Sequence, residues 1–358
     1  MKHKGKTITC SKKKANIFAK HYANVSRLKF RREERRIKLQ LKRILRSPTA
    51  NEQTADGSCN PFTIEELEKA LGLMKSKGAC GPDDIPPTFL QALGPIAKKE
   101  LLDIFNALFS NGICPQQWRV AIIIPLLKAM KSASEISSFR PISLTSCIGK
   151  LYERILSERI YHLVESKGIL SPYQAGYRKL RGCEDQIAST IQAIEDGFER
   201  PKMERSVLVL LDFLKAFDTV WREKLLVSLH QMGLPLQIIR WLREFLRNRT
   251  AQVRFNGILS QVVSFHQGVP QGSVLSPLLF ILYINDLANK LPKGLIYSMY
   301  ADDIAILATH HSIESAEAAA QRAVDIVVEW AAEWRLTLNT SKSEVSLFSS
   351  FTHDNGLI

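Results

Sequence analysis

Two short stretches decide the fold: residues 207–212 read Val-Leu-Val-Leu-Leu-Asp, and residues 300–307 read Tyr-Ala-Asp-Asp-Ile-Ala-Ile-Leu. The first is a continuous apolar run that predicts a buried strand, and the second predicts a hairpin turn leading into another strand. Asp212 therefore ends one strand, and Asp302 and Asp303 lie in the turn before the other. Three carboxylates beside apolar strands repel one another unless a cation offsets their charge.

The cation is either a basic side chain or a divalent metal ion. Adjacent aspartates in a turn are more often solvated hairpin residues than metal ligands. Together with Asp212, however, Asp302 and Asp303 can hold two Mg²⁺ ions about 3.5–4 Å apart, an arrangement that activates a hydroxyl and stabilises the leaving oxygens of a phosphoryl displacement. Such oxygen ligands suit Mg²⁺, for which Mn²⁺ can substitute, rather than zinc.

The composition is that of a globular chain of two or three structural units, with 358 residues, 45% of them hydrophobic and 23% charged. The net charge of +14 is concentrated: residues 1–46 hold 17 of the 49 basic and 2 of the 35 acidic side chains. This segment predicts a basic helical arm, which is either a solvated charged helix or a phosphate-binding arm. No apolar stretch reaches the ~18 residues of a membrane span, and no C-x-x-C pair indicates a zinc site.

Helical and strand patterns alternate without a strict βαβ repeat, so we expect an α+β fold. Thr63 and Glu66 have capping-box spacing and predict a helix to about Met74. Apolar spacing predicts further helices at 88–111, 147–167, 183–199, 222–231, 235–247 and 312–334. Strands are expected at 120–126, 207–211, 252–255, 262–266, 298–300, 304–308 and 345–348.

Seven segments, in this order, resemble motifs of reverse transcriptases. They are Gly81-Pro82-Asp83, residues 138–145 (SFRPISLT), residues 174–178 (QAGYR) with Glu184-Asp185, residues 212–218 (DFLKAFD), residues 268–277 (GVPQGSVLSP), residues 300–303 (YADD) and residues 338–344 (LNTSKSE). The first segment is a mark of LINE-type, non-LTR retrotransposon polymerases, and within that group the sequence is most similar to jockey-like elements. The resemblance covers residues 63 to about 348 and implies the fingers and palm of a right-hand polymerase.

The resemblance assigns the metal-binding triad to Asp212, Asp302 and Asp303, with the Phe213 carbonyl as a further ligand. Lys342 matches a palm lysine near the leaving pyrophosphate, where it would act with the aspartates in catalysis; a lysine near a strand start is otherwise usually just solvated.

Further matches imply nucleotide-binding residues. Phe217 matches the aromatic gate that excludes a 2′-hydroxyl, whereas without the motif it would be read as a core aromatic. Gln271 and Gly272 match the loop under the incoming nucleotide, which a conformational turn would otherwise explain. Arg140 matches the fingers arginine that contacts the triphosphate, with Lys128 as its partner; either is otherwise a surface cation.

The resemblance also implies a domain order. We expect the basic helical arm at 1–46, a linker at 47–62, fingers at 63–200, a palm at 201–350 and a truncated tail at 351–358, with the thumb absent and no endonuclease domain before the arm. We expect nucleic acid to contact the arm through Arg31, Arg32, Arg35 and Arg36.

The expected activity is RNA-directed DNA synthesis, with an RNA template, a DNA primer and dNTPs as partners and no membrane. The alternative is a catalytically silent nucleic-acid-binding remnant, suggested by the truncation and by Leu214, where family members usually carry serine. An RNA-directed RNA polymerase shares the paired aspartates but leaves Phe217 unexplained. We expect an intracellular location, in the nucleus or cytoplasm.

Overall fold

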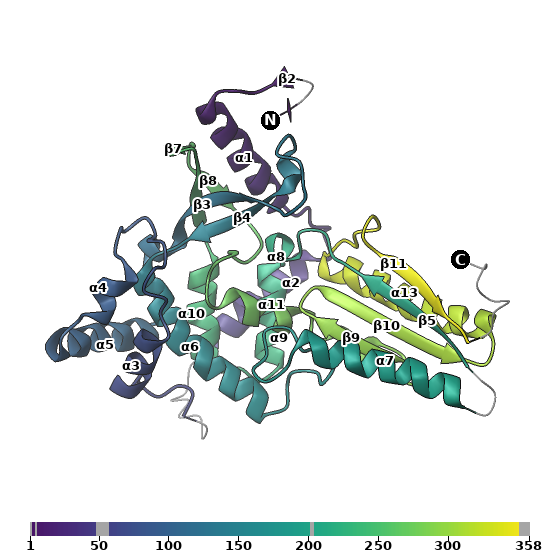
Figure 1. Cartoon of the computed structure of the whole chain (residues 1–358). Helices are drawn as coiled ribbons and strands as arrows, with labels where there is room; N and C mark the ends of the chain where they lie inside the picture. Colours follow the sequence, from purple (N-terminus) through teal and green to yellow (C-terminus); the bar gives the residue numbers. More distant parts are fainter. Residues whose placement is uncertain (1, 4–5, 48–56, 201–203, 351–358) are drawn as a thin grey trace. The chain divides into compact units, whose positions relative to one another are not determined.

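The computed structural model describes residues 2–3, 6–47, 57–200 and 204–350. Figure 1 labels its helices and strands. The chain divides into two compact units, which are described separately: unit 1 comprises 1–167 and 217–279, and unit 2 comprises 168–216 and 280–358. Most of the predicted linker (48–56), the first predicted palm residues (201–203) and the predicted tail (351–358) lie outside the described residues. The fingers and palm boundaries stay predictions.

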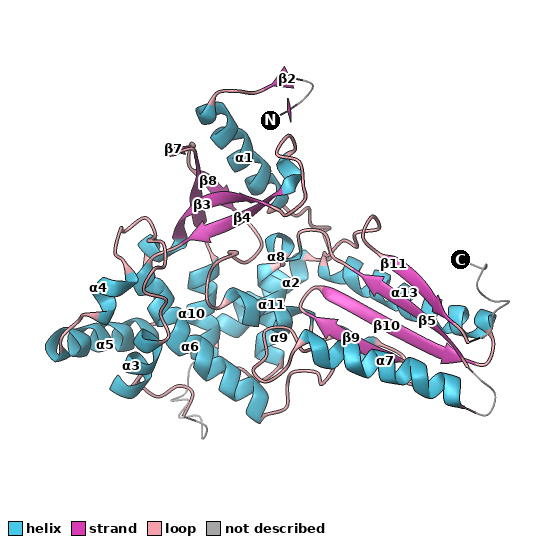
Figure 2. Cartoon of the chain, viewed as in Figure 1, coloured by secondary structure: helices cyan, strands magenta, loops and turns pink. Residues whose placement is uncertain are grey.

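Unit 1 contains a mixed sheet, drawn in magenta in Figure 2. Its strand order is β4-β3-β6-β7, with β8 also on β6. Only β3 and β6 run parallel, and the other pairs are antiparallel. The strands are β3 (Val120–Leu127), β4 (Phe139–Leu144), β6 (Arg249–Phe255), β7 (Ile258–Leu259) and β8 (Val263–Phe265). Sequence patterning missed β4 because Arg140, Pro141 and Ser143 leave it no continuous apolar run, unlike the run that precedes Pro125 in β3.

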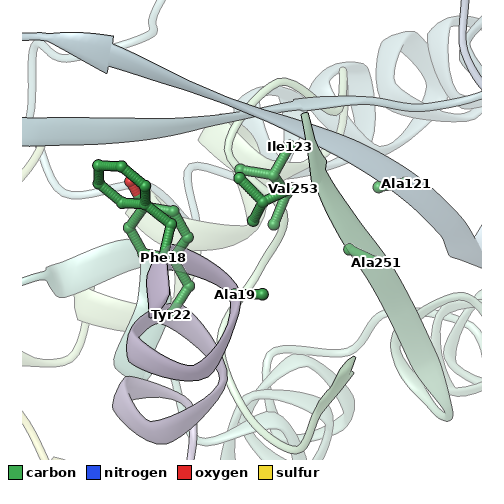
Figure 3. Close-up of a cluster of buried hydrophobic side chains, with 7 residues drawn as sticks. All are labelled: Phe18, Ala19, Tyr22, Ala121, Ile123, Ala251 and Val253. Carbon is green, nitrogen blue, oxygen red and sulfur yellow. The ribbon is translucent and has the colours of Figure 1, made fainter. Parts of the chain in front are cut away.

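Helix α1 (Ser11–Val25) packs on this sheet. Figure 3 shows Phe18, Ala19 and Tyr22 facing Ile123 and Val253, and these side chains are all buried. The helical segment expected from the basic arm is divided in two, since α2 (Arg35–Arg46) begins only after a break in which the Phe30 ring packs on Trp221. The first half of the arm is therefore part of a folded core, whereas α2 buries only Leu41.

The other helices of unit 1 surround an aromatic core. The Tyr152 ring stacks on Trp241 with centroids 4.7 Å apart, and Phe62 stacks on Phe109 at 4.8 Å. The predicted capping box is confirmed, because the Thr63 side chain and Glu66 cap each other's backbone N–H groups. The helices are α3 (Ile64–Gly72), α4 (Pro87–Gln91), α5 (Pro95–Ser110), α6 (Cys147–Ser166), α9 (Arg222–Gln231) and α10 (Leu236–Leu246).

One expected helix, 88–111, is two helices. Helix α4 ends at Gln91, and Pro95 starts α5 at its first position. Proline fits there because its missing N–H would have no partner inside the helix.

The smaller elements are β1 (Lys2–His3), β2 (Lys6–Thr7), α8 (Ala216–Thr219) and α12 (Leu287–Lys290), with single 3₁₀ turns at Gln116–Arg119 and Ile136–Ser138.

Unit 2 contains a four-stranded antiparallel sheet in the order β11-β5-β10-β9. Its strands are β5 (Arg205–Leu211), β9 (Ile296–Tyr300), β10 (Asp303–His310) and β11 (Glu344–Phe348). Helices α7 (Cys183–Glu199) and α13 (Ile313–Trp334) pack on it. Val207, Val209 and Leu211 are buried while Leu210 is exposed, so β5 buries mainly one face of the apolar run that predicted a buried strand.

Helix α11 (Ser276–Ile284) was not expected from the sequence. Leu278 to Ile284 are all buried, so the segment carries no polar stripe that would mark a helical period.

Among the described residues, every helix is too short or too polar to span a membrane.

Candidate active site

The three aspartates lie at one end of the unit 2 sheet. β5 and β10 pair with Leu211 opposite Ile304, and continuing that register by one residue places Asp212 opposite Asp303. Directly opposite residues in such a pair have Cβ atoms about 4.5–5.5 Å apart. Asp302 lies in the β9–β10 turn, as the sequence predicted, whereas Asp303 is the first residue of β10 and not a turn residue. The structure therefore brings together the carboxylates that the sequence proposed as a triad.

The turn that carries Asp302 is held by a neighbouring segment. Ala301 has a positive φ of 55°, and its N–H donates to Oε1 of the buried Gln174 at 3.0 Å. The same oxygen accepts the N–H of Gly176 at 2.8 Å. A side chain at Gly176 would collide with the Ala301 backbone, which explains the glycine. Gln174 belongs to a segment with family resemblance, but the sequence did not reveal this contact.

Asp212 is held by the loop after α13. Its Oδ2 accepts from Nδ2 of Asn339 at 2.7 Å and lies 3.0 Å from Nζ of Lys342. The N–H of Asn339 also donates to the Asp212 carbonyl at 2.8 Å, and the N–H of Leu214 donates to Thr337. Lys342 therefore lies beside Asp212, and its role near the leaving pyrophosphate stays a prediction. The largely buried Asn339 is a site residue that the sequence analysis did not single out.

The electrostatics of the triad favour a cation. Burial raises the pKa of Asp302, and Asp303 and Asp212 raise it further. Asp303 remains exposed, but partial desolvation and then repulsion from Asp212 also raise its pKa. Lys342 acts in the opposite direction on both. The pKa values of Asp302 and Asp303 stay raised despite Lys342, so carboxylate repulsion remains that a bound cation would relieve.

The residues fit a metal ion by their chemistry, because carboxylate oxygens are the ligands of hard divalent ions. Among the described residues, no three His, Cys, Asp or Glu side chains are arranged closely enough to enclose an ion. Asp212 is instead directed at Lys342 and Asn339. The Phe213 side chain is buried, and the role of its carbonyl stays a prediction.

The predicted nucleotide loop belongs to unit 1 and lies on β4. The Gln271 carbonyl accepts the N–H of Ser143 at 2.7 Å. Gly272 has φ +116°, and a Cβ there would lie 2.5 Å from the Ser143 carbonyl oxygen, so only glycine fits without strain. The Gln271 side chain donates to both carboxylate oxygens of Asp218 at 3.1 Å, which orients its amide.

The remaining nucleotide candidates also belong to unit 1. Phe217 is half-buried and is not part of the core, and its carbonyl accepts the N–H of Val269 at 2.8 Å. Arg140 and Lys128 are exposed near the same end of the β3–β4 hairpin, where Arg140 pairs with Leu126. The Lys128 ammonium contacts the Ser137 carbonyl at 3.2 Å. Their roles in triphosphate binding stay predictions.

The arginines proposed for nucleic acid lie just before and within α2. Arg31, Arg32, Arg35 and Arg36 are all exposed. Arg35 lines a groove of about 1380 Å³, whose basic side chains also come from α10 and β6. The lining includes the further cations Lys38, Lys42, Arg243 and Arg247.

Comparison with known proteins decides the family. The family described as "Reverse transcriptase (RNA-dependent DNA polymerase)" matches residues 128–354, and this range contains all three aspartates. The chain belongs to the reverse transcriptase family. It is 30% identical over 351 residues to the RNA-directed DNA polymerase from mobile element jockey of Drosophila funebris, covering 96% of this chain and 37% of the relative.

Two further relatives of the chain also come from transposable elements. The corresponding jockey protein of Drosophila melanogaster is 29% identical, covering 81% of this chain and 32% of the relative. The probable RNA-directed DNA polymerase from transposon BS of the same species is 30% identical, covering 79% and 32%. The chain thus spans about a third of the length of these relatives. Reverse transcriptases generally depend on a divalent metal ion, which agrees with the donor set above.

Proposed function

We propose that this chain is the RNA-directed DNA polymerase of a LINE-type retrotransposon. The observation that carries the proposal is that Asp212, Asp302 and Asp303 lie at one end of the sheet, where they repel one another and where Lys342 lies beside Asp212. The substrates are a DNA primer, an RNA template and dNTPs, in keeping with the printed names of the relatives.

In the proposed reaction, the primer 3′-oxygen bonds to the α-phosphorus of the dNTP, the bond to the bridging oxygen breaks, and pyrophosphate leaves. Asp212, Asp302 and Asp303, with the Phe213 carbonyl, would hold two Mg²⁺ ions, which lower the pKa of the attacking hydroxyl and offset the charge on the phosphates. Asn339 keeps one oxygen of Asp212 in a fixed direction through its 2.7 Å hydrogen bond.

Lys342 is proposed to act on the leaving group. Its ammonium lies 3.0 Å from Asp212 and is largely solvent-exposed, so it can turn toward an incoming triphosphate. A lysine there stabilises the negative charge of departing pyrophosphate and can donate a proton to it.

Nucleotide selection is assigned to unit 1. The half-buried Phe217 is proposed to exclude a 2′-hydroxyl, and Gln271 and Gly272 to lie under the nucleotide. The close approach of the Gly272 backbone to β4 and the orientation of the Gln271 amide by Asp218 support a preformed loop. Arg140, with Lys128, would contact the triphosphate, and the arginines around the start of α2 would contact nucleic-acid phosphates.

The test is primer extension on an RNA template with Mg²⁺ and dNTPs, comparing the chain with the Asp302→Asn, Asp303→Asn variant. Extension that is lost in the variant, while its cooperative melt is retained, supports the proposal. RNA binding without extension by either folded protein would instead identify a silent nucleic-acid-binding remnant. Preferred incorporation of NTPs over dNTPs would indicate an RNA polymerase and contradict the role of Phe217.

A further inference from the structure

The loop between β8 and α11, residues 266–275, has little regular structure although it carries Gln271 and Gly272. Its first half lies against residues 217–222. The N–H of Gly268 donates to the Val220 carbonyl, and the N–H of Val269 donates to the Phe217 carbonyl, both at 2.8 Å. These bonds tie the loop to the segment that bears the proposed aromatic gate, so its position depends on what holds the two together.

Arg222, the first residue of α9, makes the most extensive of these connections. Its side chain is buried, and its guanidinium binds backbone carbonyls rather than a carboxylate. Nε donates to Gly268 at 2.7 Å, Nη1 donates to Phe265 and His266 at 3.0 and 3.2 Å, and Nη2 donates to Gln267 at 3.1 Å. The Arg222 N–H also donates to the Gln267 side chain at 2.8 Å. One residue thus fixes four consecutive peptide groups.

Burying a cation without a carboxylate is unfavourable, and desolvation lowers the pKa of Arg222 to about 9. A side chain needed only to fill space could be apolar at this position and avoid that penalty. The planar fork of a guanidinium, in contrast, suits several acceptors in fixed directions, which the smaller ammonium of lysine cannot match. The geometry therefore indicates that Arg222 is present to hold the 265–268 backbone in a fixed position.

We propose that Arg222 is a positioning residue for nucleotide binding. By holding the carbonyls of residues 265–268, it keeps Gln271 and Gly272 in place against Phe217 and Asp218 before a deoxynucleoside triphosphate arrives. The inference rests on the proposed function, because it takes this loop as the nucleotide loop. Preorganisation of this kind increases affinity by removing the cost of ordering the loop on binding.

Two substitutions test the proposal in the full chain. Arg222→Met keeps the side-chain length and removes all donors, and Arg222→Lys restores one cationic group. A cavity of about 40 Å³ lined by Arg222, Gln267 and Gln271 has room for water that can bind the freed carbonyls, so the fold should survive. The control is Arg159→Met, which removes another largely buried guanidinium of unit 1, one that donates to the Asn60 and Pro61 carbonyls and to Glu66 instead.

The first measurement is amide hydrogen exchange of the peptide spanning 262–276, which needs no activity. The second is the KM for dNTP and the kcat of primer extension. We expect Arg222→Met to accelerate exchange in this peptide only, and to raise the dNTP KM about tenfold with a smaller change in kcat. Arg222→Lys should be intermediate, and Arg159→Met should leave exchange in the loop unchanged.

Unchanged exchange in Arg222→Met would overturn the proposal, because Arg222 would then not restrain the loop. Faster exchange throughout unit 1 would also overturn it, because Arg222 would then stabilise the whole unit and not the loop in particular. A loosened loop with an unchanged dNTP KM would overturn it as well. If the unsubstituted chain extends no primer, the proposed function fails and the nucleotide role of Arg222 fails with it. The exchange result would still show whether the restraint itself exists.

Discussion

Replacing Gly268 with alanine tests whether the proposed nucleotide loop packs on the 217–222 segment as closely as the structure shows. Gly268 has φ +83°, and a Cβ there would lie 2.6 Å from the Asp218 carbonyl carbon and 2.9 Å from its Cα. Gly233 also has φ +83° and belongs to the same unit, but a Cβ there would meet no atom within 4 Å. Gly233→Ala is therefore a matched control that isolates backbone strain.

The magnitudes follow from these two contributions. A positive φ costs an L-residue about 1–2 kcal/mol, so Gly233→Ala should lower the free energy of unfolding by about that amount. In Gly268→Ala the new Cβ must also displace the Asp218 backbone, which cannot rotate away as a side chain can. Overpacking of this kind costs about 1–3 kcal/mol more. The total loss in Gly268→Ala should be about 2–5 kcal/mol. The reduced entropy of the unfolded chain stabilises both variants equally and cancels in the comparison.

The assay is urea unfolding of the full chain, with the two variants compared in the same transition. Primer extension adds a second readout, because a displaced loop should also raise the dNTP KM in Gly268→Ala and not in Gly233→Ala. Equal losses of unfolding free energy in the two variants would refute the reasoning, since backbone strain alone would then account for the glycine.

Three further predictions concern carboxyl groups and their hydrogen-bond partners. A carboxyl whose pKa is raised by folding stabilises the fold below its ordinary pKa, and this contribution is lost as the pH rises through the raised pKa. The double variant Asp302→Asn, Asp303→Asn should therefore melt at a higher temperature than the unsubstituted chain at pH 7 without divalent metal. The two should melt together near pH 4, and a gap that does not widen with pH contradicts the repulsion. Asn339→Leu removes the side-chain bond to Asp212 and should lower kcat about tenfold, with a change of about 1 kcal/mol in unfolding; an unchanged kcat would show that Asn339 does not orient the carboxylate. Glu153→Ala leaves three donors before α11 without their acceptor and should cost about 3 kcal/mol in urea unfolding, whereas Glu153→Gln keeps an acceptor and should cost less, so equal losses would contradict this account.

Local patterns in the sequence were sufficient for the elements that carry the aspartates. The apolar run before Asp212 and the turn at Asp302 and Asp303 predicted strand ends, and the structure pairs those ends. The capping box at Thr63 and Glu66 was likewise readable, because its bonds join residues three positions apart. Such features depend on spacing along the chain, which the sequence contains directly.

Other elements were not predicted from the sequence because no local pattern marks them. Helix α11 is buried all round and therefore has no polar stripe, and β4 has no continuous apolar run. The 88–111 helix was predicted too long because the interruption before Pro95 is subtle in an otherwise apolar pattern. In each case tertiary packing decides the state of the backbone.

By itself, the sequence determined that this chain is an α+β protein with the motifs of a reverse transcriptase and three aspartates at strand ends. Only the tertiary structure decided what holds those parts: Asn339 and Lys342 meet Asp212 from about 130 positions away, and Arg222 reaches carbonyls more than 40 residues ahead. The physical reason is that periodicity and capping act within a few residues, whereas hydrogen bonds to buried groups depend on strand register and helix packing that bring distant segments together.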